Sequence, residues 1–540
     1  MSRITFGPRP GDLERVQALG LDAFLNQQLH PERLDDSAIE ARLAGLPTLS
    51  MSTGELMEKY PDPNQVQRKQ SVAGAFTARK PGGDSGASNA EAMSTAPMSP
   101  ASMGQFGDTP REVLAELGRE ELLRAVYSSR QLQEVMVQFW MNHFNIFAGK
   151  GPDKWMLTSF ERDTIRPRAL GRFEDLLVAT AQSPAMLFYL DNWMSSAPGS
   201  DWDGPFAAGP RFFPARPGGW QRFGPGPVRQ NQPLPGGQKR GLNENYGREL
   251  MELHTLSVNG GYTQKDVTEV ARCLTGWTVL RPRQEAEFSF NPRMHDRGEK
   301  TVLGHRITGG GIEDGLQVLH LLATHPSTAQ FISTKLCRRF VADDPPASLV
   351  QRTSREFLAS KGDMRAVLKT ILTSPEFYSE AAYRSKVKSP LETVASTLRA
   401  LNAETDGGPQ LLGLIARMGA PMFLYQAPAG YPDRAGAWIS SSALLGRLNF
   451  AALVAQNRVP GTTVSLDGAA AEGAPAAEAV DRLSYLWMGT TLSGGSRTAI
   501  LDSLDKSGAA PSGQGAVGDS FATLPSVAAL VIGSPEFQRR

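Results

Sequence analysis

One segment of the sequence concentrates the side chains that could do chemistry. Residues 243–256, NENYGRELMELHTL, place amide, carboxylate, guanidinium and imidazole groups within the apolar spacing of a buried helix. Glu249 and Glu252 share a face at i, i+3, as paired carboxylates for proton transfer or metal binding would. Arg248 stands four residues from both Glu244 and Glu252, which also fits a structural ladder of ion pairs. Both interpretations stay open, and the spacing favours the ladder.

Two histidines are further candidates for this site. On a regular helix His254 points about 200° away from Glu252, since each residue turns about 100°. A metal site within this helix alone is therefore not expected, and the sequence has neither His-Glu-x-x-His nor paired Glu-x-x-His. His143 lies on the apolar face of another predicted helix, from which it could meet His254. A satisfied core histidine is the alternative for each.

The elements that must position these residues are predicted to be helices. Thr263 opens a second helix with a near capping box, after a Gly-Gly turn. A β-hairpin is predicted from Glu287 to Ile307, with His295 in its exposed turn. Other apolar runs at helical spacing cover residues 114–144, 316–323, 327–341, 348–359, 364–373, 391–401 and 480–487. The sequence therefore predicts a mainly α fold, one large helical domain with a small β-hairpin and two irregular insertions.

Composition divides the chain into successive segments. Stretches rich in Ser, Gly and Pro bury too little apolar surface to offset their ordering entropy. The second such stretch, residues 195–241, also carries arginines and aromatic residues, which could contact a polyanion or a sugar. We expect N-terminal helices over 1–50, a flexible low-complexity insertion over 51–108, helical core over 109–194, a basic-aromatic insertion over 195–241, helical core with the hairpin over 242–457, and an Ala/Gly-rich segment with helices over 458–540.

The bulk composition limits the function classes. Lys+Arg 56 against Asp+Glu 55 gives a net charge of +1, so no strong attraction to nucleic acid is expected. No apolar run reaches the roughly 18 to 20 residues of a transmembrane helix. Cys273 and Cys337 lie in apolar runs, as buried thiols do. As written, the chain is expected to be soluble and cytoplasmic; a leader missing upstream would make it periplasmic or secreted.

The segment 243–256, with residues 260–263 and 274–277, resembles the hallmark block of the bacterial domain-of-unknown-function 1800 family. Supporting matches lie at 139–144, 295–300, 325–329, 374–377 and 430–438. The resemblance covers nearly the whole chain outside the two insertions. It implies no established activity or cofactor, and family members often carry an export signal, which this chain lacks.

The chain departs from that family at one position. Members commonly have Trp-His-Asn-His-Phe where this sequence has Met141 between Trp140 and Asn142. If the first histidine of that wording belongs to a site, Met141 weakens the site here.

Two function classes follow from the sequence. In the first, the protein is an exported or periplasmic enzyme whose carboxylates act as acid and base or as metal ligands. Its site would gather Asn142, His143, Asn245, Arg248, Glu249, Glu252 and His254. In the second, it is a non-catalytic scaffold or binding protein, and the same groups form a buried polar network. Convergence on an open pocket favours the enzyme, whereas pairing inside a closed interior favours the scaffold.

Overall fold

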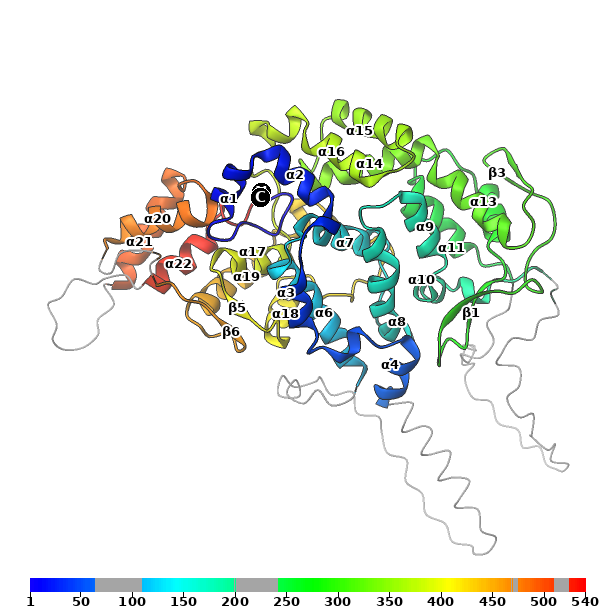
Figure 1. The fold of residues 1–540 in the computed structure, drawn as a ribbon, viewed down its shortest axis with the longest axis horizontal. Helices are drawn as coiled ribbons and strands as arrows, with labels where there is room; N and C mark the ends of the chain where they lie inside the picture. Colours follow the sequence, from blue (N-terminus) through cyan, green and yellow to red (C-terminus); the bar gives the residue numbers. More distant parts are fainter. Residues whose placement is uncertain (64–108, 199, 201–240, 468, 470–473, 509–523) are drawn as a thin grey trace, which may run out of the picture.

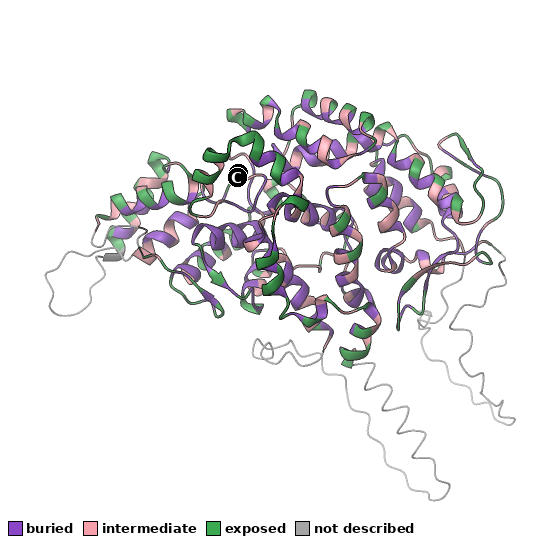
Figure 2. Ribbon diagram, in the orientation of Figure 1, coloured by how far each residue is buried: buried purple, intermediate pink, exposed green. Residues whose placement is uncertain are grey.

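The computed structural model describes residues 1–63, 109–198, 200, 241–467, 469, 474–508 and 524–540. These residues are mainly helical, with three small two-stranded antiparallel sheets, which confirms the predicted fold class. None of the helices in the described ranges combines the length and apolarity needed to cross a bilayer. Buried faces of the helices turn inward throughout the molecule, and exposed faces cover its periphery (Figure 2).

The N-terminal segment is helical over more of its length than its composition suggests. Helix α4 lies within the range assigned above to a flexible insertion. Ser52 and Glu55 form a full capping box at its start, and Leu56 and Tyr60 pack with Trp155 in a small apolar cluster. Local capping and this packing together order the segment. The elements are α1 Asp12–Leu19, α2 Leu21–Leu29, the 3-10 turn η1 Pro31–Arg33, α3 Ser37–Leu43, η2 Pro47–Leu49 and α4 Thr53–Lys59.

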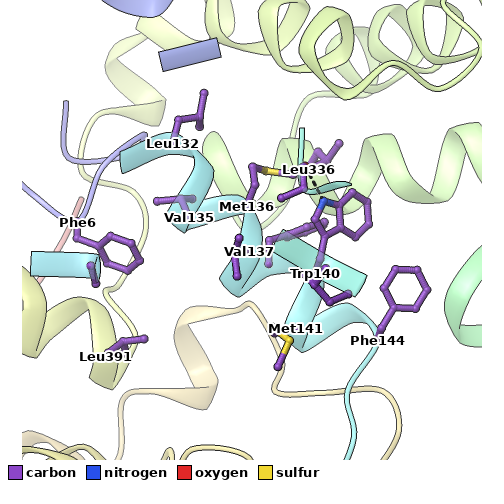
Figure 3. Packing of buried hydrophobic residues seen from close by; sticks show 14 of the residues in the cluster. Phe6, Leu132, Val135, Met136, Val137, Trp140, Met141, Phe144, Leu336 and Leu391 are labelled. Carbon is purple, nitrogen blue, oxygen red and sulfur yellow. Dashed lines mark hydrogen bonds between the residues drawn. The ribbon is translucent and has the colours of Figure 1, made fainter. Parts of the chain in front are cut away.

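Helix α7 lies near the centre of the fold (Figure 1). Its apolar stripe, including Met136 and Trp140, packs in the main core together with Leu336 of α14 (Figure 3). The Trp140 ring nitrogen donates to the carbonyl of Ala169 at 3.0 Å, so the buried indole keeps a polar partner. The elements here are α6 Pro110–Tyr127, α7 Gln131–His143, α8 Asp153–Ser159, the π-helical turn η4 Phe160–Ile165, η5 Arg166–Arg168, α9 Phe173–Ala181, α10 Pro184–Tyr189 and η6 Asn192–Met194.

The hallmark segment folds as a short α-helix followed by a π-helical turn, where a single regular helix was expected. The turn is closed by the bond from the Leu256 amide to the Met251 carbonyl, 2.7 Å. Gly247 lets α11 approach α12, since a Cβ there would lie 3.0 Å from the Val267 carbonyl oxygen. The elements are α11 Glu244–Glu249, η7 Leu250–Thr255 and α12 Gln264–Cys273, which opens with the capping box predicted at Thr263.

Two hairpins lie where one was expected. Strand β2 pairs back onto β1, and β3 pairs with β4, so the predicted turn around 295–298 connects the two hairpins. His295 is buried rather than exposed, because it lies between the Thr275 carbonyl and Asp314. The strands are β1 Trp277–Leu280, β2 Glu287–Phe290, β3 Lys300–Val302 and β4 His305–Ile307.

The remaining helices continue the core on both sides of α7. Helices α14, α15 and α16 lie side by side along the upper edge, α17 and α18 pack against α6, and α20 to α22 form the left end (Figure 1). The elements are α13 Ile312–Ala323, α14 Pro326–Phe340, α15 Ala347–Ala359, α16 Met364–Leu372, η8 Pro375–Tyr378, η9 Glu380–Ala382, α17 Pro390–Ala400, β5 Glu404–Thr405, α18 Pro409–Arg417, η10 Ala435–Ala437, α19 Ser441–Ala455, β6 Thr462–Thr463, α20 Ala476–Met488, α21 Gly494–Gly508 and α22 Leu524–Gly533.

Candidate functional site

A partly open cavity of about 490 Å³ lies against the C-terminal half of α7. Helices α6, α14 and α17 and the turn η7 contribute side chains to its wall, and the loop at 420–438 covers it. Most of the lining is apolar or aromatic, with a few charged and amide groups among it. This size and composition are those of a site for a small organic molecule.

Two asparagines on and just after α7 hold the covering loop in place. Asn142 Nδ2 donates to the Tyr431 carbonyl at 2.9 Å, and its Oδ1 accepts from the Tyr431 amide at 2.7 Å. Asn145 Nδ2 donates to the carbonyls of Tyr425 and Ala427 at 3.0 and 2.9 Å. Asn142 and Tyr431 are 289 residues apart in the chain. Amide hydrogen bonds, which apolar side chains could not make, therefore hold the covering loop against the end of α7.

A lysine and two histidines link the cavity to the hallmark segment. Lys335 of α14 lines the cavity and donates from Nζ to His143 Nδ1 at 2.8 Å. His143 Nε2 lies 3.1 Å from the backbone oxygen of His254. A carbonyl oxygen can only accept, so Nε2 carries the ring proton and Nδ1 offers its lone pair to the amine. The His254 carbonyl in the π-helical turn thus orients the His143 ring, and the ring orients the Lys335 amine.

Burial sets the protonation states of this group. It lowers the pKa of Lys335 to about 8, an effect that Asp433 opposes and Arg338 strengthens. Burial also lowers the pKa of His143 well below its ordinary value, and the nearby Lys335 ammonium acts in the same direction. The pKa of His254 falls to about 3 for the same two reasons. Both imidazoles are therefore neutral at pH 7, and Lys335 titrates close to neutrality.

Glu121 is a carboxyl group in the same cavity wall. Desolvation, followed by the nearby charges of Glu161 and Glu120, raises the pKa of Glu121 to about 8, although Arg166 opposes this shift. Within the described residues Glu121 makes no hydrogen bond or ion pair. It is therefore protonated at neutral pH and able to donate a proton into the cavity.

The covering loop adds a carboxylate and an aromatic cluster. Asp433 pairs through Oδ1 with Lys386 at 2.9 Å, while its Oδ2 is buried and has no hydrogen-bond partner in the described residues. Tyr431 lies between Tyr425 and Trp438, with ring centroids 4.3 and 5.7 Å apart. The loop thus offers one free acceptor and a flat aromatic surface.

The residues singled out from the sequence fall into two groups. His143 and His254 come together, with ring centroids 6.1 Å apart, behind Lys335. Glu249, Glu252 and Arg248 are half-buried and do not line the cavity, although Leu253 between them and His254 does.

Arg248 and Glu252 have partners of their own. Arg248 bonds Glu244 at 3.4 Å and Gln264 at 3.0 Å, and Tyr262 donates to Glu252 at 3.5 Å. Desolvation and the neighbouring Glu252 raise the pKa of Glu249. Asn245 is exposed, and its backbone amide donates to the Asn243 side-chain oxygen at 2.9 Å.

Sequence reasoning missed Lys335 and Glu121. Lys335 stands within the predicted helix 327–341, beside the apolar stripe of Ile332, Leu336 and Phe340. A lysine at that position ordinarily faces solvent, so the sequence gives no signal that this one lines a cavity. The sequence does not single out Glu121 either, because Glu120 beside it is equally acidic. Only the fold determines which of the two side chains faces the cavity.

No three His, Cys, Asp or Glu side chains of the described residues are grouped so that they could hold a metal ion. The basic-aromatic stretch for which a polyanion or sugar contact is predicted lies almost wholly outside the described residues. Its ends do meet, through the bond from the Ser196 amide to the Gly241 carbonyl at 3.2 Å.

Comparison with known proteins gives the family of the chain. No curated protein matches the sequence, and no solved structure does. The family model described as a protein of unknown function, DUF1800, matches residues 1–539, which include the motif segments at 139–145, 243–256 and 430–438 that surround the cavity. The chain belongs to the DUF1800 family.

Proposed function

We propose that the protein is an enzyme that acts on small carbonyl compounds, with Lys335 as the nucleophile that forms an imine. The observation that carries this proposal is the placement of one amine. Lys335 lines a mainly apolar cavity, bonds to a neutral imidazole at 2.8 Å, and has no carboxylate within 4 Å among the described residues. Desolvation beside another cation is a known way to make a lysine nucleophilic.

His143 is a positioning residue in this proposal. Its Nδ1 accepts one N–H of Lys335 whether the amine is charged or neutral. When Lys335 is neutral, this bond leaves the amine lone pair free for the cavity. A carboxylate in the same place would hold the ammonium form instead and raise the pKa of the amine.

The groups in the cavity account for each atom of imine formation. Neutral Lys335 Nζ attacks the carbonyl carbon, a C–N bond forms, and the π electrons move to the oxygen. One amine proton passes to that oxygen, and the Glu121 carboxyl donates a second as the C–O bond breaks. Water leaves with the oxygen and both protons, and the nitrogen lone pair completes a protonated C=N bond.

The cavity wall favours a substrate with an apolar or aromatic body. Tyr431 and Trp438 supply flat apolar surface, and most of the remaining lining is aliphatic or aromatic. Asp433 Oδ2, which lacks a partner, suits a hydroxyl or an amine elsewhere on the same molecule.

Reductive trapping tests this proposal. The full chain is incubated with butanal, butanone, benzaldehyde or acetophenone, reduced with borohydride, and mapped by peptide mass spectrometry. We expect an adduct on Lys335 at low carbonyl concentration, its loss in Lys335→Arg, and its retention in Lys369→Arg, which changes an exposed lysine of α16. Adducts spread evenly over exposed lysines, with Lys335 unmodified, would overturn the proposal.

The carboxylate and histidine site of Arg248, Glu249, Glu252 and His254 remains a separate prediction, as does export. The alternative, a scaffold with a buried polar network, is favoured by one observation. His143 is only 1% exposed, donates to the His254 carbonyl at 3.1 Å and accepts from Lys335 at 2.8 Å, so buried polar bonds join α7, η7 and α14. If trapping fails while these bonds prove important for stability, the scaffold is the better account.

A further inference from the structure

A second cavity, of about 230 Å³, lies between the first residues of the chain, the segment 377–388 and the last residues. Its charged lining is strongly unbalanced. The side-chain cations are Arg3, Arg384, Lys388, Arg539 and Arg540, whereas Glu536 is the single acidic side chain among the described lining residues. Such a concentration of one charge in a small concave space raises the local concentration of anions.

Lys388 is a deeply buried cation of this cavity. It is only 6% exposed. Its ammonium group nevertheless has no hydrogen-bond acceptor and no carboxylate within 4 Å in the described residues. The Nζ atom lies 4.0 Å from the centroid of the Phe537 ring, which is its one favourable contact. Buried ammonium groups are ordinarily paired, because desolvation costs several kcal/mol.

Arg540 also lines this cavity, and its guanidinium is only partly satisfied: Nε pairs with Glu392 Oε1 at 2.8 Å. It is 4% exposed, and its Nη1 donates to the Arg339 carbonyl at 3.0 Å. Its Nη2 is buried without any hydrogen-bond partner in the described residues. Two deeply buried cationic groups thus line one cavity with free donors.

The other two buried or half-buried cations are held without any carboxylate. Arg3 donates to the backbone carbonyls of Phe340 and Phe377, and Arg384 donates to that of Met488 at 3.2 Å. Carbonyl oxygens fix the guanidinium planes but leave their positive charges uncompensated. Among the described residues Glu536 forms no ion pair within 4 Å with either arginine, and its carboxylate accepts instead from the Ser493 amide at 3.2 Å.

We propose that this cavity binds a doubly charged oxyanion of the phosphate or sulfate class, with Lys388 and Arg540 as its inner ligands and Arg384 at its mouth. Ammonium and guanidinium donors around a compact space match the several acceptor oxygens of such a group. A carboxylate would supply only one charge and two oxygens. Burial lowers the pKa of Lys388 to about 7, and Arg384, Arg447 and Arg540 act in the same direction against Glu392, which agrees with a site where cations outnumber carboxylates.

The anion could be free or could be part of an ester. Tyr378 and Tyr383 line the same cavity and are 50% and 59% exposed. Aromatic faces at the rim would stack on a planar ring attached to the phosphate. If the ligand is an ester with such a ring, the ester binds more tightly than inorganic phosphate. If the ligand is a free anion, an attached ring adds no affinity.

Calorimetric titration of the full chain tests the site with sodium sulfate, inorganic phosphate and phenyl phosphate. Ionic strength is held constant with NaCl, since sulfate at high concentration stabilises proteins by exclusion alone. We expect saturable binding of one anion per chain. Lys388→Met should weaken it by at least about tenfold, the loss of one charge-assisted hydrogen bond. Lys369→Met removes the same charge from an exposed position and should leave the affinity unchanged.

Stability provides an independent check on the same variant. Lys388→Met removes an unpaired buried charge, so its melting temperature without anion should equal or exceed that of the wild type. Arg384→Gln, at the half-buried mouth, should weaken binding without a large change in stability. Absence of saturable binding, or equal affinity in the wild type and both variants, would overturn the proposal. Tighter binding of phenyl phosphate than of phosphate would identify an ester as the ligand.

Discussion

Gly430 touches the backbone of Asn142 so closely that no side chain fits between them. A Cβ at Gly430 would lie 2.0 Å from the Asn142 carbonyl oxygen, and the residue has φ +71°. The loop that covers the larger cavity is therefore seated on the end of α7 at the same asparagine whose side chain bonds Tyr431. Contact and hydrogen bonds act together to fix one loop position.

We expect Gly430→Ala to displace this loop and destabilise the protein. The left-handed backbone alone costs about 1 kcal/mol or more for a residue with a side chain, and the clash adds to it, for roughly 2 to 4 kcal/mol in all. Urea unfolding measures the difference. Gly436→Ala is the matched control, because no atom lies within 4 Å of its added Cβ. Equal stability of both variants would mean that the loop is not seated in this way.

His143 should control the basicity of Lys335. His143→Leu removes the acceptor for the lysine ammonium, and loss of a hydrogen bond to the charged form lowers the pKa of the amine. The pH dependence of Lys335 modification by an acylating reagent, read by peptide mass spectrometry, should have its midpoint near the pKa of about 8 in the wild type. We expect a lower midpoint in the variant. An unchanged midpoint with normal folding would show that the bond does not set the pKa.

Glu121 should make the protein less stable as pH rises. Its pKa is about 8 in the folded state, against about 4.3 in an unfolded chain, so between these values the unfolded state has released a proton that the folded state keeps. Stability attributable to this group is therefore highest below pH 4 and falls up to pH 8.

Glu121→Gln removes that pH dependence. We expect it to raise the free energy of unfolding by about 1 to 3 kcal/mol at pH 8 and to change it little at about pH 3.5, where both states hold most of the proton. Urea unfolding at the two pH values gives the comparison, and Glu58→Gln, at an exposed position of α4, is the control. A variant less stable than the wild type at pH 8 would show that Glu121 is ionised and paired.

The helical fold could be predicted from the sequence because its signals are local. Apolar spacing marks α13 to α17, and Thr263 with Asp266 forms the capping box that opens α12. The π-helical turn over 250–255 could not be predicted. The apolar spacing of the segment fits a regular α-helix, and its residue types do not mark the change to i to i+5 hydrogen bonds. The hairpin of β1 with β2 was not predicted either, because β1 directly follows helix α12 and its four residues are too few to show a clear alternation.

The site depended on contacts that no local pattern encodes. His143 could be named as a candidate because it lies on the apolar face of a predicted helix, and His254 because it belongs to the segment richest in ionisable side chains. Their common neighbour Lys335 comes from α14, which is 192 residues beyond His143 in the chain. A lysine in an amphipathic helix ordinarily faces solvent, and only the packing of α14 against α7 and the covering loop turns this one toward the cavity.

Glu249 and Glu252 provide the sharpest test of the site predicted from sequence. Desolvation raises the pKa of Glu249, so ionisation of this carboxyl costs folding stability at pH values above the usual carboxyl pKa. The Glu249→Gln variant should therefore be a few tenths of a kcal/mol more stable than the wild type at pH 7. Glu252→Gln loses only the weak bond from Tyr262 and should change stability by less than about 0.5 kcal/mol. Both variants should keep the Lys335 adduct in borohydride trapping. Elemental analysis of the same samples decides the alternative: one equivalent of metal in the wild type that is lost in both variants would make these carboxylates ligands, and it would move the centre of the chemistry from Lys335 to the hallmark segment.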